Sequence, residues 1–123
     1  MAEGKTKQGT FVKVRPDDLD VYSPAGHKDT RNRRLIGPEA GSTHVEVILG
    51  EMGPQGIGEA HAHGSCDQIF YILEGRLKVI SDKAEEILDP GDLGFIPEGV
   101  PHEVVCMSEG ARFLVMFAPP IRD

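Results

Sequence analysis

The chain has 123 residues, a formal net charge of −7 and two cysteines. This length suits a single domain, and the acidic balance differs from the basic surfaces that bind nucleic acid or anionic membranes. The polar start and the absence of any apolar run of about 18 residues predict a protein without a membrane span or signal peptide, which we expect in the cytoplasm. Cys66 and Cys106 form no CxxC pair, so reduced thiols are expected, with one buried disulfide as the alternative.

Short clusters of glycine and proline recur along the chain and predict turns between strands. FVKV (11–14) is the clearest strand before Thr43, in a segment (1–42) expected to hold an N-terminal arm and one or two edge strands. Later strands are predicted in THVEVILG (43–50), QIFYILEG (68–75), RLKVIS (76–81), LGFIP (93–97), HEVVCM (102–107) and RFLVMFA (112–118), with GEMGPQGIG (50–58) among the turns. DKAEEILD (82–89) is expected as a strand that runs into the DPGD turn.

The fold class predicted from these segments is all-β. No segment of ten or more residues carries a 3.6-residue apolar stripe. A single domain made of many short strands protects its edges by closing one sheet or stacking two, which predicts a small barrel or jelly roll. Residues 43–118 are expected to form this barrel, and residues 119–123 a C-terminal tail of the same domain.

Two histidine-bearing stretches carry the strongest chemical signal. His61 and His63 share a face in an extended chain, and Gln68 returns to that face if the chain bends at GSCD. His102 follows Pro101 at the start of another predicted strand. Three imidazoles and an amide oxygen converging inside a barrel would hold one divalent transition metal, namely zinc, manganese, iron, nickel or copper. The alternative for the three histidines is that they are ordinary surface or hydrogen-bonded residues. The separate alternative for Gln68 is that it hydrogen-bonds a metal-bound water without ligating the metal.

These two stretches resemble the two motifs of the cupin superfamily over about residues 44–118. The residues that match the first motif are Gly56, His61, His63 and Gly75, and those that match the second are Gly91, Pro97, Gly99 and His102. The resemblance implies a double-stranded β-helix, the RmlC-like jelly roll of small single-domain cupins, which are often homodimers.

The sequence departs from the cupin pattern at Gln68, where a glutamate is usual, and at Cys106, where an asparagine is usual. A glutamine oxygen can bind a metal but is neutral, so the metal keeps its full charge and its Lewis acidity. The His-His-Gln-His set is similar to that of small cupins that linearise unsaturated uronates. VMFAPPIRD resembles their C-terminal strand through Phe117, Pro119 and Arg122, but Val115 stands where their catalytic aspartate does.

Further site candidates follow from the strand faces. Glu46 is a candidate general base if its face points inward, although the face of Val45, Val47 and Leu49 is the better core candidate. Arg122 is the second catalytic candidate, through the uronate resemblance. The residues expected to line a pocket are Phe70, Ile72, Val104, Cys106 and Phe117.

The remaining charged and histidine residues have simpler interpretations. RNRRL is expected to be a solvated edge, and the functional alternative is that Arg31, Arg33 or Arg34 clamps a substrate carboxylate at the barrel mouth. His27 is interpreted as a surface residue, and His44 as a strand residue on the face of Glu46.

Three functions are consistent with this pattern. The first is an enzyme that uses the metal to activate a small oxygen-rich substrate in an isomerisation, lyase or ring-opening step. The second is a mononuclear iron dioxygenase, against which the neutral Gln68 counts. The third is a module that binds or senses a small ligand or metal without turnover, because no general base stands out beside the four ligands. A fold alone does not decide among these functions.

Overall fold

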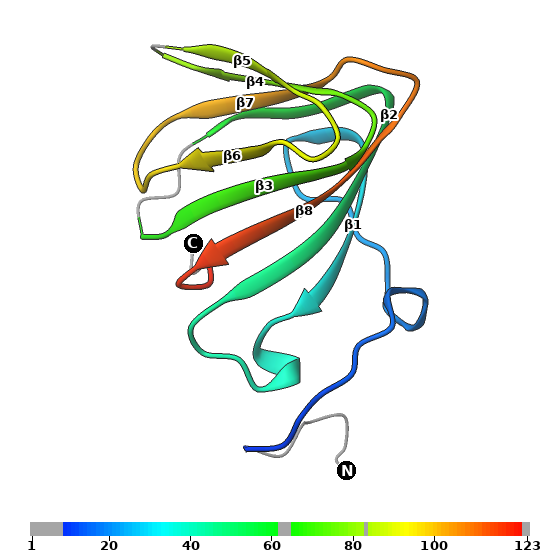
Figure 1. The fold of residues 1–123 in the computed structure, drawn as a ribbon, viewed down its shortest axis with the longest axis vertical. Helices are drawn as coiled ribbons and strands as arrows, with labels where there is room; N and C mark the ends of the chain where they lie inside the picture. Colours follow the sequence, from blue (N-terminus) through cyan, green and yellow to red (C-terminus); the bar gives the residue numbers. More distant parts are fainter. Residues whose placement is uncertain (1–8, 62–64, 83, 122–123) are drawn as a thin grey trace.

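The computed structural model describes residues 9–61, 65–82 and 84–121, without the side chains of residues 59–61. Strands dominate this part of the chain (Figure 1). In order, the elements are η1 (Pro16–Asp18), β1 (His27–Ile36), η2 (Pro38–Ala40), β2 (Glu46–His61), β3 (Asp67–Glu74), β4 (Leu77–Ser81), β5 (Glu85–Leu88), β6 (Leu93–Ile96), β7 (His102–Cys106) and β8 (Ala111–Ala118). None of the helices in the described ranges has the length and apolarity to cross a membrane.

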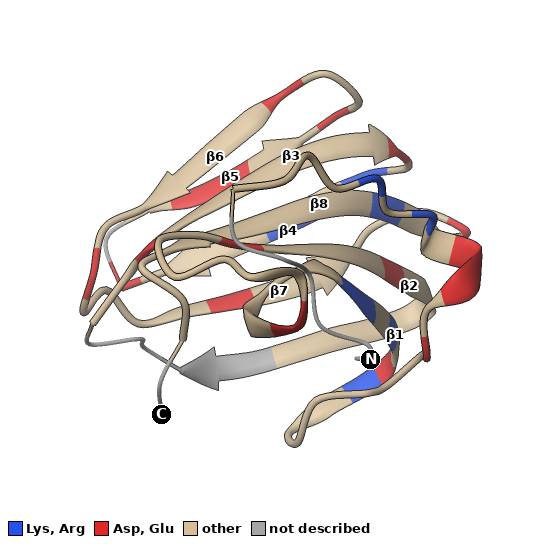
Figure 2. Ribbon diagram, turned by 90° about the horizontal axis from the view of Figure 1, so that it is seen from below, with Lys and Arg blue, Asp and Glu red and all other residues tan. Residues whose placement is uncertain are grey.

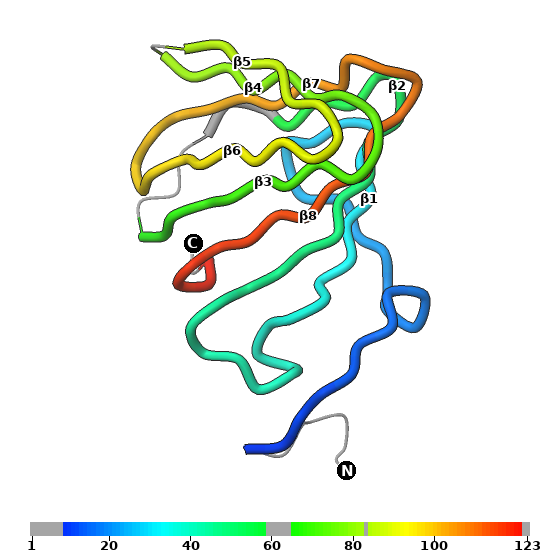
Figure 3. The backbone as a smooth tube through the Cα atoms, viewed as in Figure 1, coloured from blue at the N-terminus to red at the C-terminus, as the bar shows by residue number. Residues whose placement is uncertain are grey.

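The strands form one antiparallel sheet that curls into a nearly closed barrel. Its order is β5-β4-β7-β2-β8-β3-β6, and β1 pairs with β2 beside this path. Figure 3 shows how the chain winds between the two sides of the barrel, with the first part of the segment before β1 running along its outside. The predicted all-β, single-domain jelly-roll barrel is confirmed, and Figure 2 shows acidic residues on several sides of it.

Strand β2 is the longest strand of the barrel. It contains GEMGPQGIG, so the prediction of a turn there was wrong. Its first half pairs with β8 and its second half with β7. The partner changes near Pro54, which lacks an N–H for a continuous ladder and is tolerated at such an irregularity. There β1 contributes Asp29 at φ 53°, whose Oδ2 accepts the Gln55 N–H at 3.0 Å. The glycines and proline therefore mark a bulge at which the strand bends into the barrel wall.

The segment before Thr43 also differs from the prediction. FVKV forms no strand. Phe11 is 96% exposed, so the alternating apolar residues of this segment do not mark a buried strand face. The strand in this segment is instead β1, whose sequence HKDTRNRRLI is too polar to reveal it by apolar alternation. By contrast, β5 lies within DKAEEILD as expected.

The core follows the two-residue period of the strands. In β8, Phe113, Val115 and Phe117 point inward and are at most 7% exposed. Phe113 lies over Gly50 of β2, where an added Cβ would come within 2.6 Å of the ring. Cys66 and Cys106 are both buried, are not joined by a disulfide, and belong to this core. The inward side chains stop short of filling the barrel, which leaves the cavity described next.

Candidate metal centre and cavity

A cavity of about 490 Å³ opens inside the barrel. Strands β2, β3, β7 and β8 supply one wall, and the segment 22–34 supplies the other. The lining residues are Tyr22, Pro24, Ala25, Gly26, His27, Thr30, Asn32, Arg34, Glu46, Ile48, Met52, Gly58, Gln68, Phe70, His102, Val104, Phe113, Val115, Phe117 and Ile121. A cavity of this size is typical of sites for small organic ligands.

His102 begins β7 and reaches the cavity with 2% of its surface exposed. Its Nδ1 lies 3.0 Å from the carbonyl oxygen of Val100. Because a carbonyl oxygen only accepts hydrogen bonds, Nδ1 carries the proton, and Nε2 is the nitrogen with the lone pair. A backbone carbonyl that fixes the tautomer in this way is a common support for a metal-binding imidazole. The Phe70 ring lies edge-on to His102, with centroids 6.4 Å apart.

Gln68 is the first inward residue of β3 and is 5% exposed. Its Oε1 is fully buried and has no hydrogen-bond partner among the described residues. A buried amide oxygen left without a partner costs about 1–3 kcal/mol, so such atoms are rare. A cation bound at Oε1 would remove that cost. This oxygen and the imidazole of His102 line the same cavity, and both are donor types that bind zinc, manganese, iron or nickel.

The other two predicted ligands lie at the edge of what the structure describes. Strand register places the backbone of His61 opposite His102, a pairing that holds Cα atoms about 5 Å apart. The side chain of His61, and His63 as a whole, lie outside the described residues, as does Arg122. Within the described ranges there is no group of three His, Cys, Asp or Glu residues placed to hold a metal. The four-ligand set therefore stays a prediction, to which the described structure contributes Gln68 and His102.

Three of the five residues expected to line the pocket do so, namely Phe70, Val104 and Phe117. Ile72 and Cys106 are not among the lining residues, which corrects that part of the expectation. Both are buried in the core, at 1% and 6% exposure. Ile72 pairs with Phe113 and Cys106 with Leu77, at the end of the barrel that side chains fill.

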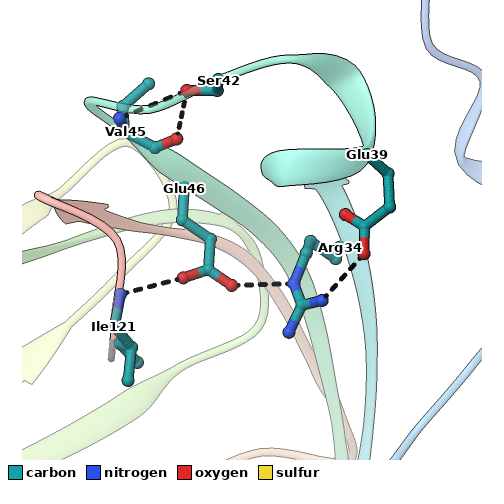
Figure 4. A network of polar contacts seen from close by, with 6 residues as sticks. All are labelled: Arg34, Glu39, Ser42, Val45, Glu46 and Ile121. Carbon is teal, nitrogen blue, oxygen red and sulfur yellow. Dashed lines mark hydrogen bonds and ion pairs between the residues drawn. The ribbon is translucent and has the colours of Figure 1, made fainter. Parts of the chain in front are cut away.

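Glu46 lies inside the barrel, which corrects the expectation that the face of Val45, Val47 and Leu49 is the core face; of these three only Leu49, at 3% exposure, is buried. Only 4% of Glu46 is exposed, and its carboxylate is held at both oxygens (Figure 4). Oε2 accepts the Arg34 Nε–H at 2.8 Å, and Oε1 accepts the Ile121 N–H at 3.2 Å. Register sets Glu46 opposite Phe117 on β8, and Phe117 opposite Gln68 on β3. Two strand spacings, about 10 Å, therefore separate the backbones of Glu46 and Gln68.

Two arginines of RNRRL fit the interpretation as a solvated edge, and the third fits the interpretation as a group at the cavity. Arg31 and Arg33 form ion pairs with Glu51 at 3.5 and 4.0 Å, whereas Arg34 lines the cavity. Burial lowers the pKa of Arg34, but attraction to Glu46, Tyr22 and Glu39 and the hydrogen bond to Glu46 together outweigh it, and the pKa rises. The Arg34 guanidinium also lies 5.8 Å from the centre of the Tyr22 ring. Burial raises the pKa of Tyr22 above its usual value, although the charge of Arg34 opposes this shift.

Sequence reasoning missed most of the cavity wall that comes from the N-terminal segment. His27 was expected at the surface, yet it lines the cavity and packs on Gly58, where an added Cβ would lie 3.1 Å from the imidazole. Thr30 and Asn32 line it as well. None of them stands at ligand spacing, so the sequence carries no motif for them. His44, expected on β2, is exposed in a bend before that strand.

Residues 48–117 match the family described as "Cupin domain". The chain is 33% identical to the pectin degradation protein KdgF of Dickeya dadantii (strain 3937), covering 87% of this chain and 93% of that one. It is 32% identical to the oxalate decarboxylase OxdC of Bacillus subtilis (strain 168), covering 72% of this chain and 26% of that one. The chain thus spans about a quarter of the length of the decarboxylase.

Solved structures of similar proteins share the barrel. KdgF from Halomonas sp. superposes with a TM-score of 0.78 at 20% identity, covering 93% of this chain and 97% of that one, and this likeness shows the fold. The polyketide cyclase RemF from Streptomyces resistomycificus has the same TM-score at 29% identity, covering 93% of this chain and 85% of that one.

Proposed function

Because the chain belongs to the cupin family, we propose that it is a metal-dependent enzyme acting on a small oxygen-rich molecule. The metal ligands in this proposal are His61, His63, Gln68 and His102. When bound, a divalent metal would supply Lewis-acid polarisation of substrate oxygen atoms. An isomerisation, lyase or ring-opening step suits a ligand set without a carboxylate, and the likeness to a pectin degradation protein and a cyclase supports this choice.

The observation that carries the proposal is the Oε1 atom of Gln68. It is buried in the wall of a cavity large enough for an organic ligand, and it has no hydrogen-bond partner among the described residues. A purely structural glutamine would find a donor, since an unsatisfied buried amide oxygen is destabilising. His102 supports the same reading, because the Val100 carbonyl leaves its Nε2 with the lone pair.

Glu46 is a group in this cavity that could move a proton. Its carboxylate is fixed by Arg34 and by the Ile121 N–H, so it is oriented as a general base should be. Val115 occupies the place of the aspartate in the uronate-linearising cupins that the chain resembles, and it pairs with Ile48, the next inward residue of β2 after Glu46. We therefore assign the proton transfer to Glu46 and expect a substrate that differs from the unsaturated monouronates.

Turnover assays on a panel of small hydroxy, keto and carboxylate compounds, followed by NMR, test this function. A substrate should be converted by the wild-type protein, and Glu46→Gln should lower kcat about 100-fold or more without changing the metal content. Glu39→Gln is the matched control, because Glu39 pairs with the same Arg34 at 3.4 Å but is mostly exposed. Compounds that stabilise the protein and return unchanged would instead support the non-catalytic binding module.

We also propose that the chain forms a homodimer through the outer face of β3 and β6. This face carries exposed apolar side chains that a monomer would leave in water. Register places Tyr71 opposite Leu93 and Ile69 opposite Phe95, and Leu93 and Phe95 are 58% and 57% exposed. Contiguous apolar surface of this kind marks interaction sites.

A further inference from the structure

The two walls of the cavity differ in chemistry. The barrel wall carries the polar Glu46, Gln68 and His102 and is otherwise apolar, with three phenylalanines. Its apolar residues are Ile48, Met52, Phe70, Val104, Phe113, Val115 and Phe117. The wall from the N-terminal segment offers hydroxyl, amide and imidazole groups, from Tyr22, Thr30, Asn32 and His27. A ligand that fills this cavity must therefore be apolar on one face and polar along another edge.

The apolar wall is continuous across three strands. Register aligns Ile48 of β2, Val115 of β8 and Phe70 of β3 in one row. In the neighbouring row, Gly50 leaves room for the Phe113 ring, which lies 6.1 Å from Phe70 between ring centres. These rows form a continuous apolar floor that leads to His102 at the edge of Phe70. Flat rings pack well on such a surface, in stacked or edge-on geometry.

The charge on the opposite wall is already balanced. Arg34 is the one lysine or arginine among the described lining residues, and carboxylates of Glu46 and Glu39 lie 2.8 and 3.4 Å from it. A second anionic group on the ligand would meet these carboxylates and be repelled. Neutral hydroxyl groups would instead find acceptors and donors along this wall.

The cavity has room for a ligand larger than a single sugar ring. About 490 Å³ corresponds to roughly sixteen water molecules at about 30 Å³ each. A monosaccharide acid occupies less than this, because covalent bonds hold its atoms closer than hydrogen bonds hold waters. It would leave much of the apolar floor in contact with water.

We propose that the substrate is a flat molecule of at least two fused rings, apolar over its faces, with hydroxyl groups along one edge and a metal-binding pair of oxygens at one end. This proposal rests on the proposed metal-dependent function. The oxygen pair would lie at Gln68 and His102, the ring faces on Val115, Phe113 and Phe117, and the hydroxylated edge along the N-terminal wall. The apolar Val115 determines the specificity, because a carboxylate in its place would face the ring system.

Binding of three probes to the purified protein tests the proposal. The probes are 3-hydroxy-2-naphthoate, salicylate and D-galacturonate, of which the first two carry the same oxygen pair on two rings and on one. Naphthoate fluorescence reports binding against a low background, because the chain has no tryptophan. The second ring should tighten binding about tenfold, from about 55 Å² of added apolar burial, and galacturonate should bind most weakly. Equal affinities, or tightest binding of galacturonate, would overturn the proposal.

Two near-isosteric variants locate the effect. Val115→Thr places a hydroxyl against the ring face and should weaken naphthoate binding about fivefold. Val105→Thr makes the same change on the outer face of β7 and should leave binding unchanged. Equal effects of both variants would contradict the assigned position.

Metal content measured in the same samples separates the two proposals. A preference for naphthoate in protein that holds no metal supports the cavity assignment while the metal-dependent function fails. One equivalent of metal with no preference among the probes overturns the cavity assignment and leaves the metal-dependent function standing.

Discussion

Gly50→Ala tests how the cavity is shaped. An added Cβ would lie 2.6 and 2.9 Å from Cε2 and Cζ of Phe113, so the ring must shift toward the cavity. Overpacking of this kind costs about 1–3 kcal/mol, while replacing a strand glycine by alanine gains about 0.5–1 kcal/mol. The net expectation is a loss of about 1 kcal/mol and a fall in Tm of about 3–5 °C. Thermal and urea unfolding followed by circular dichroism measure both quantities.

A double-mutant cycle with Phe113→Leu isolates the clash. In the Phe113→Leu background the smaller side chain leaves room for the methyl group, so Gly50→Ala should cost nothing or stabilise by about 0.5 kcal/mol. Gly110→Ala is the control, because its Cβ would come no closer than 3.4 Å to the Met52 carbonyl oxygen. An equal loss from Gly50→Ala in both backgrounds would refute the steric explanation.

Two further predictions concern the surface and pH. Phe95→Glu should convert the proposed dimer into a monomer, because Phe95 is 57% exposed on the proposed interface. Analytical ultracentrifugation measures the mass, and circular dichroism should be unchanged. A mass equal to that of the wild type would exclude this face as the interface. Tyr22 holds its proton more tightly in the folded than in the unfolded chain, since its pKa is raised by burial from 10.0. Its contribution to stability is therefore complete below pH 10 and is lost as the pH rises from there through the folded-state pKa. As the pH rises over that range, the free energy of unfolding of Tyr22→Phe should fall less than that of the wild type. Parallel curves of unfolding free energy against pH for the two proteins would contradict this reasoning.

The strands of the barrel could be predicted from the sequence because their inward side chains alternate or run continuously apolar. β3, β7 and β8 are examples. The predicted strand ended too early because Gly53, Pro54 and Gly56 are typical of a turn. In the structure they form a bulge within β2, between the part that pairs with β8 and the part that pairs with β7. An edge strand was expected before Thr43, but β1 could not be located because its outward residues are charged, as Arg31 is beside Glu51, and carry no apolar stripe.

The candidate site was predictable where residues stand at motif spacing and not elsewhere. Gln68 and His102 come from such motifs, and both line the cavity. The inward direction of Glu46 could not be read from THVEVILG, because both faces of that segment carry apolar residues. Tyr22 and His27 reach the cavity through the path of the N-terminal segment, which no local pattern specifies.

The metal content of the purified protein, compared with that of Gln68→Leu, tests the central claim most directly. Elemental analysis should find about one equivalent of a divalent transition metal in the wild type and much less in the variant. Without metal, Gln68→Leu should also be as stable as the wild type or more stable, because it removes the buried oxygen without a partner. Equal metal content in the two proteins, or none in either after reconstitution with Zn²⁺, would contradict the assignment of Gln68 as a ligand.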